Sequence, residues 1–131
     1  MNRRKEREQA FVLIFEKSFR DDETVENILE DALSSDFYES SEYSEKIFTG
    51  TVSNLDEIDG IIKDNLKGWK IDRISKVSLS ILRLAIYEIR YVTSVPSGVS
   101  INEAVELSKK YATVEDTSFI NGVLGSVARS E

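Results

Sequence analysis

A strongly apolar stretch between residues 74 and 92 places the tightest constraint on what this chain can fold into. Its apolar side chains recur at spacings of three and four residues, which is typical of one face of an α-helix; they are Ile74, Val77, Ile81, Leu82, Ala85, Ile86 and Ile89. Leu79 and Leu84 widen this face, so little of the helix surface is left for water. A helix of this kind is usually central, and we expect the other elements to pack around it.

Residues that form turns are scarce in the sequence, which has one proline and six glycines among 131 residues. A fold of many strands would need turn residues roughly every 8–12 positions, so an all-α fold is favoured. A chain of this length buries about 65–70% of the surface that it exposes when unfolded. We therefore expect residues 1–131 to form one compact all-α domain.

The same periodicity predicts six helices besides the central one, which makes about seven in all. They span residues 3–19, 24–33, 42–55, 56–67, 100–111 and a last segment that starts near residue 119. Polar residues before these helices are candidate N-caps, because their side chains can accept hydrogen bonds from the first free N–H groups. The candidates are Thr24 or Asp22, Ser41 or Ser40, Asp56 with Asp59, Asp72 before the central helix, and Ser100 with Glu103 as a capping box.

Four other residues carry local expectations. Gly50 lies inside a predicted helix, where glycine costs about 1 kcal/mol relative to alanine, so we expect a close helix crossing there. Trp69 follows Gly68 in a turn and is expected to pack against the protein, with stacking on a nucleobase as the alternative. Phe37 and Tyr38, in the loop before residue 42, are expected to pack on the core.

The sequence contains no histidine and no cysteine, which removes the commonest general base, the usual zinc ligands and any disulfide. The acidic run from Asp21 to Glu23 lacks the ligand spacing and the glycine of a calcium loop. We therefore expect no catalytic residues, no metal site and no cofactor. An enzyme that uses lysine or a bound metal stays as an alternative hypothesis. No apolar run approaches 18 residues, so we expect a cytoplasmic protein without a membrane segment.

Charge is distributed unevenly along the chain, whose formal net charge is −7. Residues 1–20 hold six basic and three acidic side chains. Residues 21–64 hold two basic and fourteen acidic side chains, and residues 65–131 hold nine basic and seven acidic ones. The start of the first predicted helix carries four basic residues: Arg3, Arg4, Lys5 and Arg7. They fit either a solvated helix end or a grip on phosphate, since guanidinium groups match phosphate geometry. Because charges are screened within about 10 Å, the overall acidity does not exclude a local RNA site.

Four ordered segments of the chain form a more specific pattern. They are the arginine-rich start with Ala10 and Phe15, Gly50 with the Asp56–Ile58 turn, the run ILRLAIYE from Ile81 to Glu88, and a tail that joins Pro96, INEAVEL (Ile101–Leu107) and FINGVL (Phe119–Leu124). In this order and spacing they resemble the NusB family of bacterial transcription antitermination factors. The resemblance covers essentially the whole chain, and the last two segments are its most specific part.

The resemblance implies an all-α fold of two packed three-helix units, which agrees with the helices predicted from periodicity. It also implies binding to the boxA element of nascent RNA together with NusE, a protein of the small ribosomal subunit. Such a protein acts without enzymatic activity, in an antitermination complex that reaches RNA polymerase indirectly, especially on ribosomal RNA operons. The resemblance leaves open whether the protein is a monomer or a homodimer.

The resemblance also carries site residues onto this sequence. The RNA-contacting start of the family falls on Arg3, Arg4, Lys5 and Arg7, and its second RNA-facing segment falls on Asp116, Thr117, Phe119 and Asn121. We expect a NusE-facing edge on the central helix at Ser78, Arg83, Tyr87 and Glu88. Two departures weaken these expectations: Glu6 and Glu8 interrupt the arginine run, and Ser78–Ser80 is neutral where members often carry an acidic residue.

A protein-binding module without RNA contact is the other class of function that fits the sequence. In that case the central helix and the segment from Tyr87 to Tyr91 would form a partner or self-association face. If the four N-terminal cations do contact single-stranded RNA, the logarithm of the affinity should fall with the logarithm of salt with a slope of about −3. That slope corresponds to modest affinity, so we expect a partner to add binding surface.

Overall fold

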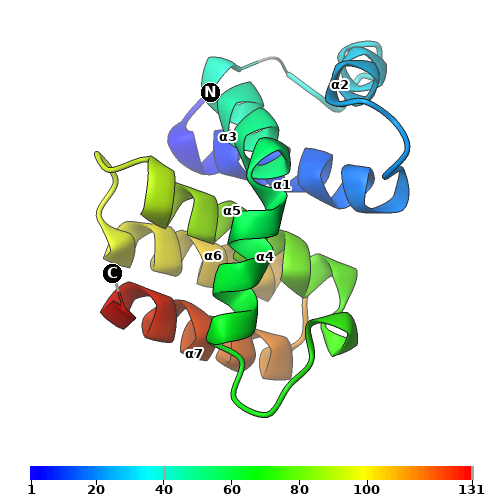
Figure 1. Ribbon diagram of the computed structural model, residues 1–131. Coiled ribbons are helices and arrows are strands. Elements are labelled where there is room, and N and C mark those ends of the chain that lie inside the picture. The colour runs from blue at the N-terminus through cyan, green and yellow to red at the C-terminus, as the bar shows by residue number, and fades with distance from the viewer. Residues whose placement is uncertain (40, 131) are drawn as a thin grey trace.

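The computed structural model describes residues 1–39 and 41–130, and these residues form seven α-helices and one short 3₁₀ helix, with no strand (Figure 1). The α-helices are α1 (Arg3–Phe19), α2 (Val25–Leu33), α3 (Glu42–Ser53), α4 (Leu55–Asp64), α5 (Lys76–Tyr91), α6 (Ser97–Tyr111) and α7 (Val114–Ser130). The 3₁₀ helix, η1, spans Ile71–Arg73. The prediction of an all-α fold with about seven helices is confirmed.

Helix α5 lies at the centre of the fold and contacts α1, α3, α4, α6 and α7. Helix α1 packs on α2 and α3 to form one group, and α5, α6 and α7 pack on one another to form a second. Figure 1 shows α4 running across the second group, where it contacts α5 and α7. This arrangement agrees with the expected pair of three-helix units.

The apolar face of α5 forms much of the core, as its spacing predicts. Five residues of this face are at most 2% exposed: Ile81, Leu82, Leu84, Ala85 and Ile86. Facing helices contribute further fully or nearly buried residues, among them Ala10, Ile14, Phe48, Ile58, Ile120 and Leu124. Burial of a large aliphatic side chain contributes roughly 1.5–3 kcal/mol, so this packing holds the helices that carry the charged residues in fixed positions.

At Gly50, α3 lies directly against a side chain of α5. A Cβ atom added at Gly50 would lie 2.3 Å from Cζ of Tyr87, whose side chain is 8% exposed and stacks on Tyr91. Only a glycine leaves room for the tyrosine ring in this position. The expected close helix crossing is present.

We therefore expect Gly50→Ala to lower the free energy of unfolding by about 1–3 kcal/mol, because the added methyl group overpacks the contact with Tyr87. Gly60→Ala in α4 is the matched control, since a Cβ there meets no atom within 4 Å. That control should raise stability by up to about 1 kcal/mol through helix propensity. Urea unfolding of the two variants measures both effects. A Gly50→Ala protein as stable as Gly60→Ala would show that Tyr87 moves aside freely.

Two of the five predicted N-caps are correct and three are wrong. Thr24 accepts a hydrogen bond from the backbone N–H of α2 and Ser41 does the same for α3, while Ser40 lies outside the described residues. Helix α5 is capped by Ser75 and not by Asp72, which lies within η1. The N-cap of α4 is Asn54, which makes no side-chain capping bond, while Asp59 binds Arg83 instead.

The starts of α6 and α7 also differ from the prediction. Helix α6 begins at Ser97, directly after Pro96, whose φ of −60° is already suited to a helix, so Ser100 lies inside the helix and is no cap. Helix α7 begins at Val114, before the expected start. Its capping box joins Thr113 and Asp116, whose backbone N–H groups each donate to the other residue's side chain, at 3.4 and 3.1 Å.

The segment between α2 and α3 holds an exposed aromatic ring. Phe37 is 95% exposed, so the expectation that it packs on the core is wrong. Tyr38 is partly buried against the core, as expected. A ring of this size is usually covered in a folded protein.

Metal and membrane sites are not found in the part of the chain that the structure describes. No three acidic side chains lie close enough together there to hold a metal ion. None of the described helices is long and apolar enough to cross a membrane.

Candidate nucleic-acid interface

A buried carboxylate, that of Glu88, links four helices near the start of α1. Glu88 is fully buried in α5 and accepts hydrogen bonds from Arg7 Nε of α1 at 2.8 Å and Ser100 Oγ of α6 at 3.0 Å. The hydroxyl group of Tyr43 in α3 also donates to it. Burial, together with this hydrogen bond to Glu88, raises the pKa of Tyr43 well above its ordinary value. Glu88 therefore fixes the position of the α1 start against the rest of the fold.

Arg7 belongs to this buried network and is not an exposed phosphate contact. Its side chain is only 6% exposed, and its charge is already paired with Glu88. This burial speaks against direct contact of Arg7 with RNA, which stays a prediction. The sequence holds a signal for this burial, because Arg7, Phe11 and Ile14 share one helical face and the last two are core residues.

Arg3, Arg4 and Lys5 form the exposed part of the basic cluster. Their side chains are 54, 65 and 57% exposed, whereas the carboxylates that pair with them are only 12–16% exposed. Lys5 pairs with Glu8 at 3.4 Å, and Arg3 pairs with Glu6 at 3.1 Å and lies over the ring of Tyr43. The carboxylates are recessed beneath the cations, so the surface that faces solvent is basic.

Arg4 connects α1 to α6. Its Nε and Nη2 donate to the two carboxylate oxygens of Glu103 at 3.0 and 2.9 Å, which is the two-pronged geometry that guanidinium groups also use with phosphate. These hydrogen bonds lower the pKa of the Glu103 carboxyl. Glu103 therefore holds the guanidinium of Arg4 in place at the surface.

Lys110, at the C-terminal end of α6, was missed from the sequence and joins the same surface. It is 62% exposed and pairs with Glu8, which also accepts hydrogen bonds from Lys5 and Tyr111. Burial alone would raise the pKa of Glu8, but the hydrogen bonds from Lys110, Tyr111 and Lys5 outweigh it and lower the pKa to about 2. Because Glu8 and Lys110 are 102 positions apart, nothing local in the sequence indicates their pairing.

The lowered pKa of Glu8 predicts how stability depends on pH. The ionised carboxylate stabilises the folded state fully above its ordinary pKa of 4.5, and this stabilisation is lost as the pH falls towards about 2. Glu8→Gln should therefore be less stable than the natural protein at pH 7, and the difference should shrink below pH 4.5 and vanish near pH 2. Urea unfolding at several pH values tests this, with Asp36→Asn in the exposed loop as the control for loss of one charge. A stability difference that stays constant with pH would contradict the assignment.

The second set of expected RNA contacts lies on the first turns of α7. Asp116 belongs to the capping box, and Thr117 Oγ1 lies 2.9 Å from Ser108 Oγ of α6. Phe119 packs edge-on against Trp69 with ring centroids 5.9 Å apart, whereas Asn121 is exposed. Trp69 packs as expected, although 60% of it stays exposed.

Helix α6 connects the two sets. On one side its residues Glu103 and Lys110 contact α1. On the other side, α6 and α7 border a shallow hollow of about 440 Å³, whose lining includes Asn102, Thr117 and Asn121. The two expected RNA-binding segments therefore flank α6, and an RNA strand that touches both would have to cross this helix.

Three of the four residues expected on the NusE-facing edge are buried. Ser78 is 1% exposed, Tyr87 8% and Glu88 0%, because α5 is surrounded by other helices. The side chain of Arg83 is 14% exposed and makes two hydrogen bonds to Asp59, at 2.9 and 2.8 Å. These three side chains are not accessible on the surface of α5, and a NusE contact on this helix stays a prediction.

Comparison with known proteins agrees with this geometry. The model of the NusB family matches residues 4–129. The transcription antitermination protein NusB of Listeria monocytogenes serotype 4a (strain HCC23) is 44% identical over 131 residues, which cover 98% of this chain and 97% of that protein.

Two solved structures share the fold. A structure of NusB from T. maritima has a TM-score of 0.89 at 34% identity. The match covers 100% of this chain and 93% of that one. A crystal structure of the antitermination factors NusB and NusE in complex with double-stranded RNA contains a chain with a TM-score of 0.86 at 28% identity, and each chain is covered completely. The sequence match over nearly the full length and the shared arrangement of helices show that this protein belongs to the NusB family.

Proposed function

We propose that this protein is an RNA-binding transcription antitermination factor. In this proposal it binds boxA-type RNA together with NusE during transcription of ribosomal RNA operons, in the cytoplasm and without catalysing a reaction. The observation that carries the proposal is the outward-facing basic surface of Arg3, Arg4 and Lys5 above recessed carboxylates. The names of the relatives support it, since they are antitermination proteins and one related structure contains NusE and RNA.

The charge pattern supports weak binding by this protein alone. With Arg7 buried, three exposed cations remain at the start of α1, and they contribute about −2 to the salt slope for single-stranded RNA instead of about −3. Asp116, Thr117, Phe119 and Asn121 form the second proposed contact, across α6. Of the residues considered for the NusE contact, Arg83 is the one that reaches the surface. A partner that adds RNA-binding surface is therefore part of the proposal.

The test is a titration of boxA-containing RNA at two salt concentrations, with and without NusE. We expect weak, salt-dependent binding by this protein alone and tighter binding when NusE is present. A scrambled RNA of the same length and composition is the control. Equal affinity for boxA and scrambled RNA, with and without NusE, would overturn the proposal.

A further inference from the structure

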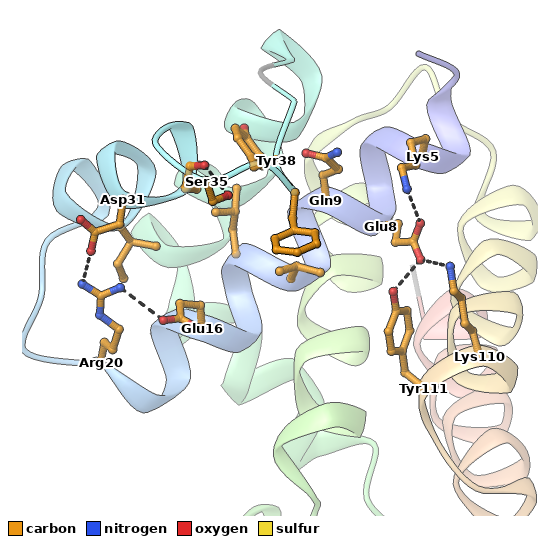
Figure 2. Close-up of a pocket in the computed structure, with 15 residues that line it drawn as sticks. Lys5, Glu8, Gln9, Glu16, Arg20, Asp31, Ser35, Tyr38, Lys110 and Tyr111 are labelled. Atoms are coloured by element: carbon orange, nitrogen blue, oxygen red, sulfur yellow. Dashed lines mark hydrogen bonds and ion pairs between the residues drawn. The ribbon is translucent and has the colours of Figure 1, made fainter.

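A hollow of about 450 Å³ lies between α1, α2, the segment after α2 and the C-terminal end of α6 (Figure 2). This volume falls in the range of roughly 300–1,000 Å³ that is typical of ligand pockets. The aliphatic part of its lining consists of Val12, Leu13, Ile28 and Ala32. None of the residues of the buried network around Glu88 lines this hollow.

Aromatic side chains border the hollow. Phe37 is 95% exposed and Tyr111 is 40% exposed, whereas Tyr38 is partly buried against the core. Single-stranded RNA is bound in this way by many proteins, which stack unpaired bases on aromatic rings beside a basic groove. The exposed ring of Phe37 thus supplies a stacking surface that the packing of this protein does not use.

The two ends of the hollow differ in charge (Figure 2). At one end Lys5 and Lys110 share the single carboxylate of Glu8, which leaves a net positive charge. At the other end Arg20 contacts both Glu16 and Asp31, which leaves a net negative charge. Lys5 also belongs to the basic surface at the start of α1, so a polyanion bound there would meet the positive end of the hollow first.

We propose that this hollow is a binding pocket for an unstacked nucleobase of single-stranded RNA. Phosphate groups of the strand lie on Lys5 and Lys110, and the base enters between Phe37 and Tyr111 over the apolar floor. The proposal rests on the proposed RNA-binding function and deepens it. It adds a site that contacts a base, next to cations that contact only phosphate groups. The basic entrance, continuous with Arg3–Lys5, favours RNA over an acidic or apolar peptide as the occupant.

Photo-crosslinking tests the position of the base. A boxA-containing single-stranded RNA carries 4-thiouridine at one uridine position at a time, and the crosslinked residues are mapped by mass spectrometry on the protein in complex with NusE. At least one position should crosslink to Phe37, Tyr38 or Tyr111. Crosslinks confined to the first turns of α7, or to NusE, would overturn the pocket.

Two substitutions test its contribution to affinity. Phe37→Ala should weaken RNA binding about tenfold with an unchanged salt slope, because stacking is lost and no charge is removed. Lys110→Ser should reduce the magnitude of the salt slope by about 0.7, the value of one phosphate contact on a single strand. Phe19→Ala is the matched control, since Phe19 is 60% exposed on the same helix as Lys5 but does not line the hollow. It should bind RNA as the natural protein does.

The outcomes separate this proposal from the proposed function. If Phe37→Ala binds RNA normally while Arg3→Ala/Arg4→Ala binds weakly, the pocket is wrong and the RNA-binding function stands. If Phe37→Ala loses affinity for NusE but not for RNA, the occupant is a protein and the nucleobase proposal is overturned. If the natural protein binds no boxA RNA even with NusE, both proposals fail. Because Phe37 is almost wholly exposed, its replacement leaves the core packing unchanged, which urea unfolding verifies.

Discussion

Replacing Glu88 by alanine should lower the free energy of unfolding by about 3–5 kcal/mol, the cost of removing one partner from a buried ion pair. The change would leave Arg7 buried without its main partner, and the hydroxyl groups of Tyr43 and Ser100 without this acceptor. Small domains are stable by about 5–15 kcal/mol, so the variant would lose a large part of its stability. Urea unfolding followed by circular dichroism measures the loss.

Two further variants separate the buried charge from a general effect of removing a carboxylate. Glu106→Ala removes the partner of Lys109 in an exposed ion pair on α6 and should cost less than about 1 kcal/mol. Glu88→Gln keeps one oxygen that can accept from Tyr43, and its amide NH2 can donate to the Ser100 hydroxyl oxygen, so it should lose less stability than Glu88→Ala. Equal stability of Glu88→Ala and Glu106→Ala would show that the network around Glu88 is not needed for folding.

The double substitution Arg3→Ala/Arg4→Ala should weaken binding of single-stranded boxA RNA on the order of 25-fold at about 0.1 M salt. This value assumes that each cation makes one phosphate contact, which contributes about 0.7 to the salt slope. The salt slope should fall in magnitude by about 1.4 for the same reason. Both side chains are more than half exposed, so the helices should stay folded. Fluorescence anisotropy at several salt concentrations measures affinity and slope together.

The control for this experiment removes two cations from another part of the surface. Lys67→Ala/Lys70→Ala changes the net charge equally, and both residues are exposed in the segment before η1. Figure 1 places this segment at the end of the molecule away from the start of α1. An equal loss of affinity in both double variants would mean that net charge alone, and no specific surface, governs RNA binding.

Arg7→Ala would be a misleading test of RNA contact, although the sequence alone suggests it. Any loss of binding in that variant would follow from loss of the ion pair with Glu88 and a displaced α1 start. Stability must therefore be measured beside affinity for each substitution in the basic cluster.

The helices could be predicted from the sequence because their signals are local. The spacing of apolar residues in α5 and the polar caps Thr24 and Ser41 depend on neighbours within one or two turns. The start of α6 was misjudged, because Ser100 and Glu103 have the pattern of a capping box but bind Glu88 and Arg4 instead. A local pattern cannot show that a distant residue competes for the same side chain.

The candidate site was predicted only in part for the same reason. The exposure of Arg3, Arg4 and Lys5 follows from their place at the first turn of an amphipathic helix. The contribution of Lys110, the hollow beside Phe37 and the burial of Ser78 depend on how α1, α2, α5 and α6 meet. Such contacts arise only when helices that are separate in the sequence are packed together.

The recessed carboxylates beneath the N-terminal cations have a consequence for how readily RNA leaves. A phosphate that arrives at Arg4 must share the guanidinium with Glu103, so binding exchanges one anionic partner for another instead of filling an empty position. Each exchange therefore contributes less binding free energy than a phosphate contact with an unpaired cation would. When the phosphate leaves, the ion pair between the cation and the carboxylate can form again. The surface is thus suited to rapid dissociation of RNA between successive transcripts. Slow dissociation would then depend on the additional contacts that a partner protein supplies.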